Sequence, residues 1–283
     1  MSQSVPVSAR RGQRWRVRAA LVCAALVVSL VALDASVPVA PARAASTFVL
    51  LQMNLCNSGM AHSCYSFGRA VDEAAGKIRA RPPDMVSLQE VCSGDFYSGA
   101  GWGKLGQAMA DLYGSENVAV DFMPAFNRDR KDYYHCLNGT MFGVALVHRG
   151  NGREFHYGWY RAQDPSDEMR TWTCGTLVKD RLTGCTTHLS TDPAVAIRQC
   201  HELIAILASP WVLPEVIVAG DFNLTSQPGK PYDAQGCTPP GYERRSDNSL
   251  QQVFYTANIQ WISGGTERMD YTDHPLLYET FHI

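Results

Sequence analysis

The chain has 283 residues, of which 46% are hydrophobic and 18% charged, and this composition excludes a disordered, a collagen-like or a multi-span membrane protein. Its 25 Lys and Arg residues nearly balance its 27 Asp and Glu residues, but six arginines and only one acidic residue fall in residues 1–44. Residues 45–283 therefore hold 19 basic and 26 acidic side chains and a net charge of −7. This charge argues against an architectural nucleic-acid binder, although a local cationic groove remains compatible with it.

Residues 1–44 have the pattern of a secretory signal peptide. An arginine cluster precedes an uncharged run over residues 19–33, and small residues then lead to Ala42-Arg43-Ala44. A helix of that run would be about 22 Å long, which is shorter than the roughly 30 Å hydrocarbon core of a bilayer. We expect the segment to be cleaved, leaving a secreted, extracellular protein without a permanent membrane anchor.

Residues 45–283 contain no linker, repeat or low-complexity segment, and a mixed domain of this size commonly folds undivided. Short apolar or alternating runs predict strands in most of this segment. The predicted strands cover residues 48–54, 85–89, 118–122, 141–148, 172–178, 184–188, 216–219, 253–255 and 276–281.

Two segments, 67–79 and 193–207, have helical periodicity, and Asp192 stands where it could cap the second helix. The predicted inward faces are formed by Val71, Ala75 and Ile78 in the first and by Ile197, Leu203 and Ile204 in the second. The order of elements predicts an α/β protein in which helices cover sheets and polar residues at strand ends form the site.

Export is also indicated by the cysteines, since an even number remains after removal of the signal segment. Eight cysteines allow 105 connectivities, and we predict that neighbours pair. A metal site is the alternative, but the sequence contains no Cys-x-x-Cys motif and no Cys/His cluster with zinc spacing. The predicted disulfides are Cys56 with Cys64, Cys92 with Cys136, Cys174 with Cys185, and Cys200 with Cys237.

Several predicted strands end abruptly in polar side chains. Each one has an ordinary structural explanation, such as a turn residue or a hydrogen-bonded core histidine. Together, side chains from these strand ends would converge on one cleft and supply oxygen ligands for a hard cation and groups for acid–base chemistry. The polar strand ends are Asn54, Gln89-Glu90, Thr187-His188, Asp221-Phe222-Asn223 and Thr272-Asp273-His274.

These motifs resemble the endonuclease/exonuclease/phosphatase superfamily typified by deoxyribonuclease I, and the resemblance covers essentially all of residues 45–283. It implies a catalytic domain with a four-layer α/β sandwich, in which two mixed sheets pack face to face with helices outside. The motifs are Asn54, Leu88-Gln89-Glu90, Phe142-Gly143-Val144-Ala145-Leu146, Thr187-His188-Leu189, Gly220-Asp221-Phe222-Asn223-Leu224 and Thr272-Asp273-His274-Pro275.

The resemblance implies a metal-dependent phosphodiesterase. Asn54, Glu90 and Asp273 would hold Mg²⁺, with Ca²⁺ or Mn²⁺ as alternatives. Among the residues with catalytic roles, His274 would be the general base, since imidazole titrates near neutral pH. Asp221 would orient the water or the metal, while Asn223 and His188 would donate to phosphate oxygens.

One position departs from the family pattern. Where relatives usually carry an Asp that orients the catalytic histidine, the best local match here is Gln251. A neutral amide stabilises an imidazolium less well than a carboxylate does. Either another carboxylate, such as Asp270, orients His274, or its action as a base is weakened.

A basic and aromatic stretch is the sequence's main indication of a nucleic-acid substrate. Arg128, Arg130 and Tyr134 belong to it, and Arg170 is a further candidate for substrate binding. An ordinary solvated loop has the same composition. We therefore predict a monomeric secreted nuclease, and keep as alternatives a phospholipid head-group phosphodiesterase or phosphatase and an inactive binding module.

Overall fold

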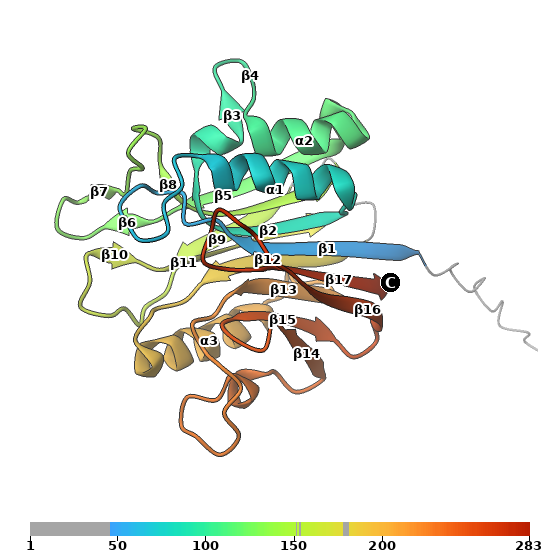
Figure 1. Cartoon of the computed structure of the whole chain (residues 1–283). Helices are drawn as coiled ribbons and strands as arrows, with labels where there is room; N and C mark the ends of the chain where they lie inside the picture. Colours follow the sequence, from blue (N-terminus) through green and yellow to red (C-terminus); the bar gives the residue numbers. More distant parts are fainter. Residues whose placement is uncertain (1–45, 151, 153, 178–180) are drawn as a thin grey trace, which may run out of the picture. The chain divides into compact units, whose positions relative to one another are not determined.

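The computed structural model describes residues 46–150, 152, 154–177 and 181–283. The predicted signal peptide and Val178, the end of one predicted strand, lie outside these residues. Two six-stranded mixed sheets dominate the described chain (Figure 1). The first has the order β16-β17-β1-β2-β8-β5 and the second the order β14-β15-β13-β12-β11-β9.

The strands of the first sheet are β16 (Gln260–Glu267), β17 (Leu276–His282), β1 (Thr47–Asn54), β2 (Met85–Cys92), β8 (Phe142–Arg149) and β5 (Val118–Pro124). Those of the second are β14 (Tyr242–Ser246), β15 (Gln251–Thr256), β13 (Val216–Asp221), β12 (Leu182–His188), β11 (Thr171–Leu177) and β9 (Phe155–Trp159). Small sheets add β10 (Glu168–Met169), β6 (Phe126–Asn127) and β7 (Asp132–Tyr133), and the pair β3 (Tyr97–Ser98) and β4 (Gly101–Trp102).

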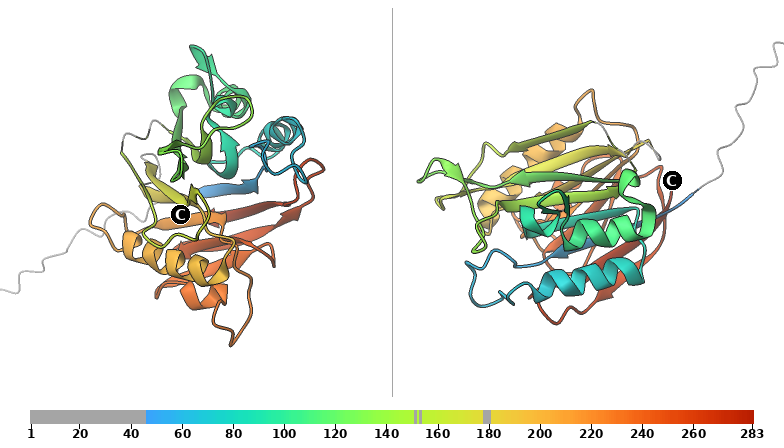
Figure 2. Two further views of the ribbon diagram at one scale, coloured as in Figure 1. Left: turned by 90° about the vertical axis from the view of Figure 1, so that its left-hand side faces the viewer. Right: turned by 90° about the horizontal axis from the view of Figure 1, so that it is seen from above.

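Helices cover the outer faces of both sheets, so the fold has four layers (Figure 2). Helices α1 (Arg69–Ala80) and α2 (Lys104–Tyr113) pack on the first sheet, and α3 (Pro193–Leu207) packs on the second. Three short 3-10 helices, η1 (Ser93–Asp95), η2 (Ser115–Asn117) and η3 (Ala234–Cys237), lie in connections of the described chain. The predicted four-layer α/β sandwich is confirmed.

The central strands are apolar on both faces because both faces are covered. In β1, Leu51 and Met53 point toward the helices, whereas Phe48 and Leu50 point into the core between the sheets. Ile217 and Ala219 of β13 enter the same core from the opposite sheet. Burial on both faces explains why these strands appear in the sequence as continuous apolar runs.

Two parallel strand pairs position the site. β1 and β2 are parallel and joined through α1, with Asn54 opposite Gln89. β12 and β13 are parallel and joined through α3, with His188 opposite Asp221. Because the carboxyl ends of parallel strands lie at one edge of a sheet, each pair presents its terminal polar residues together.

All nine predicted strands and both predicted helices are confirmed within the described residues. Asp192 caps α3 by accepting hydrogen bonds from the backbone N–H groups of Ala194 and Val195. Of the residues predicted to face inward on α3, Leu203 is buried, whereas Ile197 and Ile204 are only partly buried at the margin of the core. The four predicted disulfides are all present.

Candidate active site

The polar strand ends line one pocket of about 420 Å³. Glu90, His188, Asp221, Asn223 and His274 all contribute to its wall. They come from both sheets and from the loop before β17. The convergence predicted from the sequence therefore occurs, and Asp273 lies at the same pocket, where its side chain is 58% exposed.

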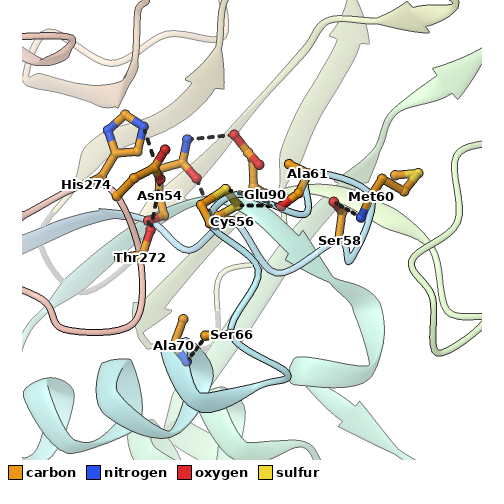
Figure 3. Close-up of a disulfide and its surroundings, with 12 residues drawn as sticks. Asn54, Cys56, Ser58, Met60, Ala61, Ser66, Ala70, Glu90, Thr272 and His274 are labelled. Carbon is orange, nitrogen blue, oxygen red and sulfur yellow. Dashed lines mark hydrogen bonds and ion pairs between the residues drawn. A yellow bond between two sulfur atoms is a disulfide. The ribbon is translucent and has the colours of Figure 1, made fainter.

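Asn54 connects two carboxylates of this pocket, those of Glu90 and Asp221. Its side-chain Nδ2 donates to Glu90 Oε1 at 3.0 Å and to Asp221 Oδ2 at 2.9 Å. Its Oδ1 accepts from the backbone N–H of Cys56 at 3.1 Å, next to the Cys56–Cys64 disulfide (Figure 3). One buried amide thus fixes the spacing between carboxylates that belong to different sheets.

Glu90 occupies a strained backbone position. Its φ is 53°, in the left-handed region, and it lies at a bulge in the pairing of β2 with β8. For a residue other than glycine this conformation costs about 1 kcal/mol or more. The bulge turns Glu90 toward the pocket, whereas Gln89 hydrogen-bonds to Gln52 between the sheets. Burial raises the pKa of Glu90 above its ordinary value, and the hydrogen bond from Asn54 opposes this shift.

His188 is buried beneath a guanidinium group. Arg170 Nη1 lies 3.0 Å from Nδ1 and 3.1 Å from Nε2 of the imidazole. Burial, with the positive charges of Arg170 and His274, holds the pKa of His188 well below its ordinary value. The neutral form of His188 is thereby favoured, and a neutral imidazole can act as an N–H donor.

His274 lies beside two carboxylates. Its Nε2 is 3.5 Å from Asp221 Oδ2 and 3.9 Å from Asp273 Oδ1. The segment between β16 and β17 that carries Asp273 and His274 is a turn, as joint action of these adjacent residues requires. Thr272 anchors the turn by donating its hydroxyl to the backbone carbonyl of Asn54 at 2.8 Å.

Asp221 and Asn223 both face the pocket, whereas Phe222 is fully buried behind them. On an extended segment, residues two apart would share a face, as the spacing of Asp221 and Asn223 predicts. That extended backbone is absent here, because β13 ends at Asp221 and Asn223 has a φ of 50°. Asn223 Nδ2 donates to the backbone carbonyl of Leu189 at 2.9 Å, which ties the end of β13 to the end of β12. A left-handed turn therefore achieves what alternation along a strand was expected to achieve.

Gln251 does not replace the missing carboxylate by contacting the imidazole. It pairs with Asp221 in the sheet, and its Nε2 donates to the backbone carbonyl of Pro275 at 2.7 Å. Asp270, the alternative partner considered for His274, is exposed, and its carboxylate lies 3.3 Å from Arg268 Nε. The carboxylate beside His274 is instead that of Asp221.

Only part of the predicted substrate-binding set reaches the pocket. Arg170 and Tyr134 line it, and the Tyr134 hydroxyl donates to Asp167 at 3.2 Å. Arg128 instead hydrogen-bonds the backbone carbonyl of Asp164, and Arg130 is exposed on the turn between β6 and β7. These two arginines lie outside the pocket lining because the short β6–β7 hairpin carries them away from it.

One pocket carboxylate was missed. Glu168 lines the pocket, and its Oε1 lies 3.3 Å from Arg170 Nη1. Burial raises the pKa of Glu168, while the charge of Arg170 opposes the shift. The sequence signal that could have identified Glu168 is its position two residues before Arg170, because residues two apart on an extended segment share a face.

The donor set fits a hard divalent cation. Partly buried Glu90 and buried Asp221 accept from one amide, and Asp273 adds a more exposed carboxylate at the pocket wall. Oxygen ligands of this kind suit Mg²⁺, Ca²⁺ or Mn²⁺ better than zinc. The sulfurs nearest to Asp273 are those of Cys56 and Cys64, which form a disulfide and are not metal ligands.

A four-layer α/β sandwich with carboxylates, amides and histidines at the joined strand ends has the groups that phosphoester hydrolysis requires. The sequence profile of the Endonuclease/Exonuclease/phosphatase family matches residues 64–272. The chain belongs to this family and is a metal-dependent hydrolase of phosphoester bonds, so it is an enzyme and not an inactive binding module. A search among curated proteins found no match.

Solved structures share the fold at low sequence identity. An endonuclease/exonuclease/phosphatase from Bacteroides vulgatus has 14% identity and a TM-score of 0.58, over 83% of this chain and 98% of that one. The human Nocturnin catalytic domain with bound sulfate has 15% identity and a TM-score of 0.57, over 84% and 94%. D. rerio TDP2 complexed with a single-strand DNA product has 13% identity and a TM-score of 0.57, over 84% and 100%.

Proposed function

We propose that this chain is a secreted, Mg²⁺-dependent nuclease that cleaves phosphodiester bonds of extracellular DNA or RNA. The observation that carries the proposal is the pair Glu90 and Asp221, held on the amide of Asn54, with His188 and His274 within 3.9 Å of these carboxylates. Support comes also from the solved TDP2, a protein of the same fold that was crystallised with a DNA product.

His274 is the general base of the proposed reaction. Asp221 lies close enough to stabilise the imidazolium that forms when Nε2 takes a proton from water. The water oxygen bonds to phosphorus, and the bond from phosphorus to the leaving oxygen breaks. The leaving oxygen takes up a proton from a solvent water, and His274 later releases its own proton to solvent.

The remaining pocket residues hold the phosphate. The guanidinium of Arg170 brings a fixed positive charge to the wall, and neutral His188 donates an N–H group. Asn223 contributes an amide that is already oriented by Leu189. A divalent cation held by Glu90 and Asp273 would supply positive charge to the phosphate oxygens. Asn54, expected as a third ligand, instead positions Glu90, because its amide Nδ2 donates to that carboxylate and its Oδ1 accepts from Cys56 N–H.

Secretion is proposed from the signal-like residues 1–44 together with the four disulfides. Within the described residues, no helix combines the length and apolarity needed to cross a membrane. We propose that residues 45–283 form the mature, monomeric catalytic domain.

A phospholipid head-group phosphodiesterase is the second candidate, because the hairpin β3–β4 carries two aromatic residues. Tyr97 stacks on Trp102 with 6.2 Å between ring centroids and is 47% exposed. Trp102, however, packs against Gly106 of α2, and the Tyr97 hydroxyl donates to the backbone of Val120. Both side chains thus have contacts within the protein, so the hairpin favours the nuclease over the lipid enzyme.

The deciding experiment is a substrate screen with purified residues 45–283. We expect nicking of supercoiled plasmid or cleavage of RNA in Mg²⁺, and no cleavage in EDTA. Sphingomyelin vesicles, mononucleotides and a p-nitrophenyl phosphodiester serve as comparison substrates. Hydrolysis of phospholipid without cleavage of nucleic acid would overturn the proposal in favour of the second candidate.

A further inference from the structure

A row of aromatic side chains lies on the surface outside the pocket. Phe155, Tyr157 and Trp159 are alternate residues of β9 and are 48, 55 and 38% exposed. Residues two apart on a strand share one face. The intervening His156 points the other way and stacks on Trp211 at 3.9 Å between ring centroids. The row therefore occupies a single face of the strand.

The row continues onto the small sheet beside it. Trp159 packs on Phe126 of β6 at 5.8 Å, and Phe126 packs on Tyr133 of β7 at 6.2 Å. At the far end, Phe155 and Tyr157 stack at 5.2 Å with 23° between their planes. We call Tyr133, Phe126, Trp159, Tyr157 and Phe155 the aromatic row.

One end of the aromatic row lies beside residues of the active-site pocket, although its rings are not part of the pocket lining. Trp159 pairs with Thr171 in the sheet, directly after the pocket residue Arg170. Tyr134, the neighbour of Tyr133, also lines the pocket. From Trp159 the strand leads away to Phe155, about 13 Å further on at 3.3 Å per residue. This adjacency places the rings within reach of a polymer that extends beyond the pocket.

Exposed aromatic rings on an edge strand raise the risk of aggregation. β9 is the last strand of its sheet, and exposed apolar edge strands invite aggregation. Charged residues flank the row, with exposed Arg130 and Lys131 before Tyr133 and exposed Arg161 after Trp159. Exposed Asp129 and Asp132, with exposed Glu154 before Phe155, balance these three positive charges. Planar rings beside a few cations suit unpaired bases on a phosphate chain.

We infer that the aromatic row binds single-stranded nucleic acid, with two or three bases beyond the cleaved bond stacking on the rings of β9. The inference rests on the proposed nuclease function and specifies its substrate as an unpaired strand. A row along one strand of the sheet follows a linear polymer better than it follows the plane of a membrane.

The test measures binding in EDTA, so that no bond is cut. Fluorescein-labelled oligothymidines of two, four and eight nucleotides are titrated with wild-type protein and followed by anisotropy. The variants are Tyr157→Thr and the double variant Phe155→Thr with Tyr157→Thr, because threonine keeps strand propensity without a ring. Tyr157→Phe retains the ring, and Tyr232→Thr removes an exposed tyrosine far along the chain, in the segment after β13.

We expect wild-type affinity to rise with oligonucleotide length. The double variant should bind the eight-nucleotide strand about thirtyfold more weakly, since each stacked base contributes substantially, and should lose the dependence on length. Tyr157→Phe should bind like wild type, as should Tyr232→Thr. Thermal unfolding within about 2 °C of wild type establishes that the variants are folded.

Other results would overturn the inference. Unchanged length dependence in the double variant would show that the rings bind no bases. Loss of binding to phosphatidylcholine–phosphatidylserine vesicles, with unchanged binding of the eight-nucleotide strand, would assign the row to a membrane. A third outcome separates the two proposals. If the protein cleaves neither plasmid nor RNA but its oligonucleotide binding still depends on the rings, the proposed nuclease function is rejected and the aromatic row remains a binding site.

Discussion

Asn54 donates a hydrogen bond of 2.9 Å to Asp221, a residue 167 positions later and in the other sheet. The same amide donates to Glu90 at 3.0 Å. This contact joins the ends of the two parallel strand pairs at a single point. It also means that the two sheets must be correctly packed before the site exists.

The first prediction concerns this bridge. We expect Asn54→Ala to lower kcat/KM on nucleic acid at least about thirtyfold, because both carboxylates lose a buried donor and their spacing. Asn117→Ala, on the exposed 3-10 helix η2, is the control and should retain wild-type kcat/KM. A kcat/KM of Asn54→Ala close to that of wild type would show that the hydrogen bonds of Asn54 to the two carboxylates do not contribute to catalysis.

The general base is tested by histidine replacement. His274→Ala and Asp221→Ala should each reduce kcat at least about a hundredfold, as loss of acid–base or electrostatic groups does. His135→Ala removes an exposed histidine of the β7–β8 connection and should have no effect. Wild-type turnover in both site variants would refute the assigned roles.

Metal binding can be followed without activity. We expect Mg²⁺ at about a hundredfold excess over its Kd to stabilise the wild type by roughly 2 to 3 kcal/mol, and therefore to raise its Tm. Glu90→Gln should abolish this shift, whereas Glu116→Gln, at an exposed site on η2, should retain it. Equal Mg²⁺ responses in the two variants would place the cation elsewhere.

Glu279 predicts a pH dependence of stability. It is 3% exposed, and burial raises its pKa from 4.5 to about 7, although a hydrogen bond from Trp261 Nε1 opposes the shift. The folded protein then binds more protons than the unfolded chain between these pH values, so stability falls as pH rises through this window.

Glu279→Gln imitates the protonated side chain and should remove this loss. Above pH 7 we expect the variant to gain roughly 3 kcal/mol or slightly more over wild type, at about 1.4 kcal/mol per pKa unit. Below pH 4.5 the two proteins should have similar free energies of unfolding. Chemical denaturation at pH 4.5, 6 and 8 provides the measurement, and a constant difference across these values would contradict the titration of Glu279.

We expect one disulfide to contribute more to stability and another to contribute more to activity. Replacing Cys200 and Cys237 with Ala opens a loop of 37 residues and should cost about 4 kcal/mol of unfolding free energy. Replacing Cys56 and Cys64 with Ser opens a loop of 8 residues and should cost about 2.5 kcal/mol. The second pair should nevertheless lower activity more, since Cys56 N–H holds Asn54 in place. Denaturant titration and kcat/KM on each double variant test this order.

The sequence predicted the central strands well because each is buried on both faces and therefore strongly apolar. It did not predict α2, which begins after Gly103 without a side-chain cap, nor the exposed strands β9, β14 and β16. β14 and β16 have no clear alternation of apolar and polar residues, and in β9 the alternating aromatic side chains are exposed and do not enter the core. These strands therefore depend on pairing with strands that are already in place.

The amino-acid sequence alone determined the candidate residues of the site, because chemistry of this kind requires carboxylates, amides and histidines at strand ends. It also determined the disulfide partners, because neighbouring cysteines close short loops. The tertiary structure decided which of these residues meet. The bulge that turns Glu90, the left-handed turn at Asn223 and the contact of Gln251 with Pro275 all depend on the neighbouring chain. Side-chain direction at a strand end is fixed by the segments packed around it, and local sequence carries little information about them.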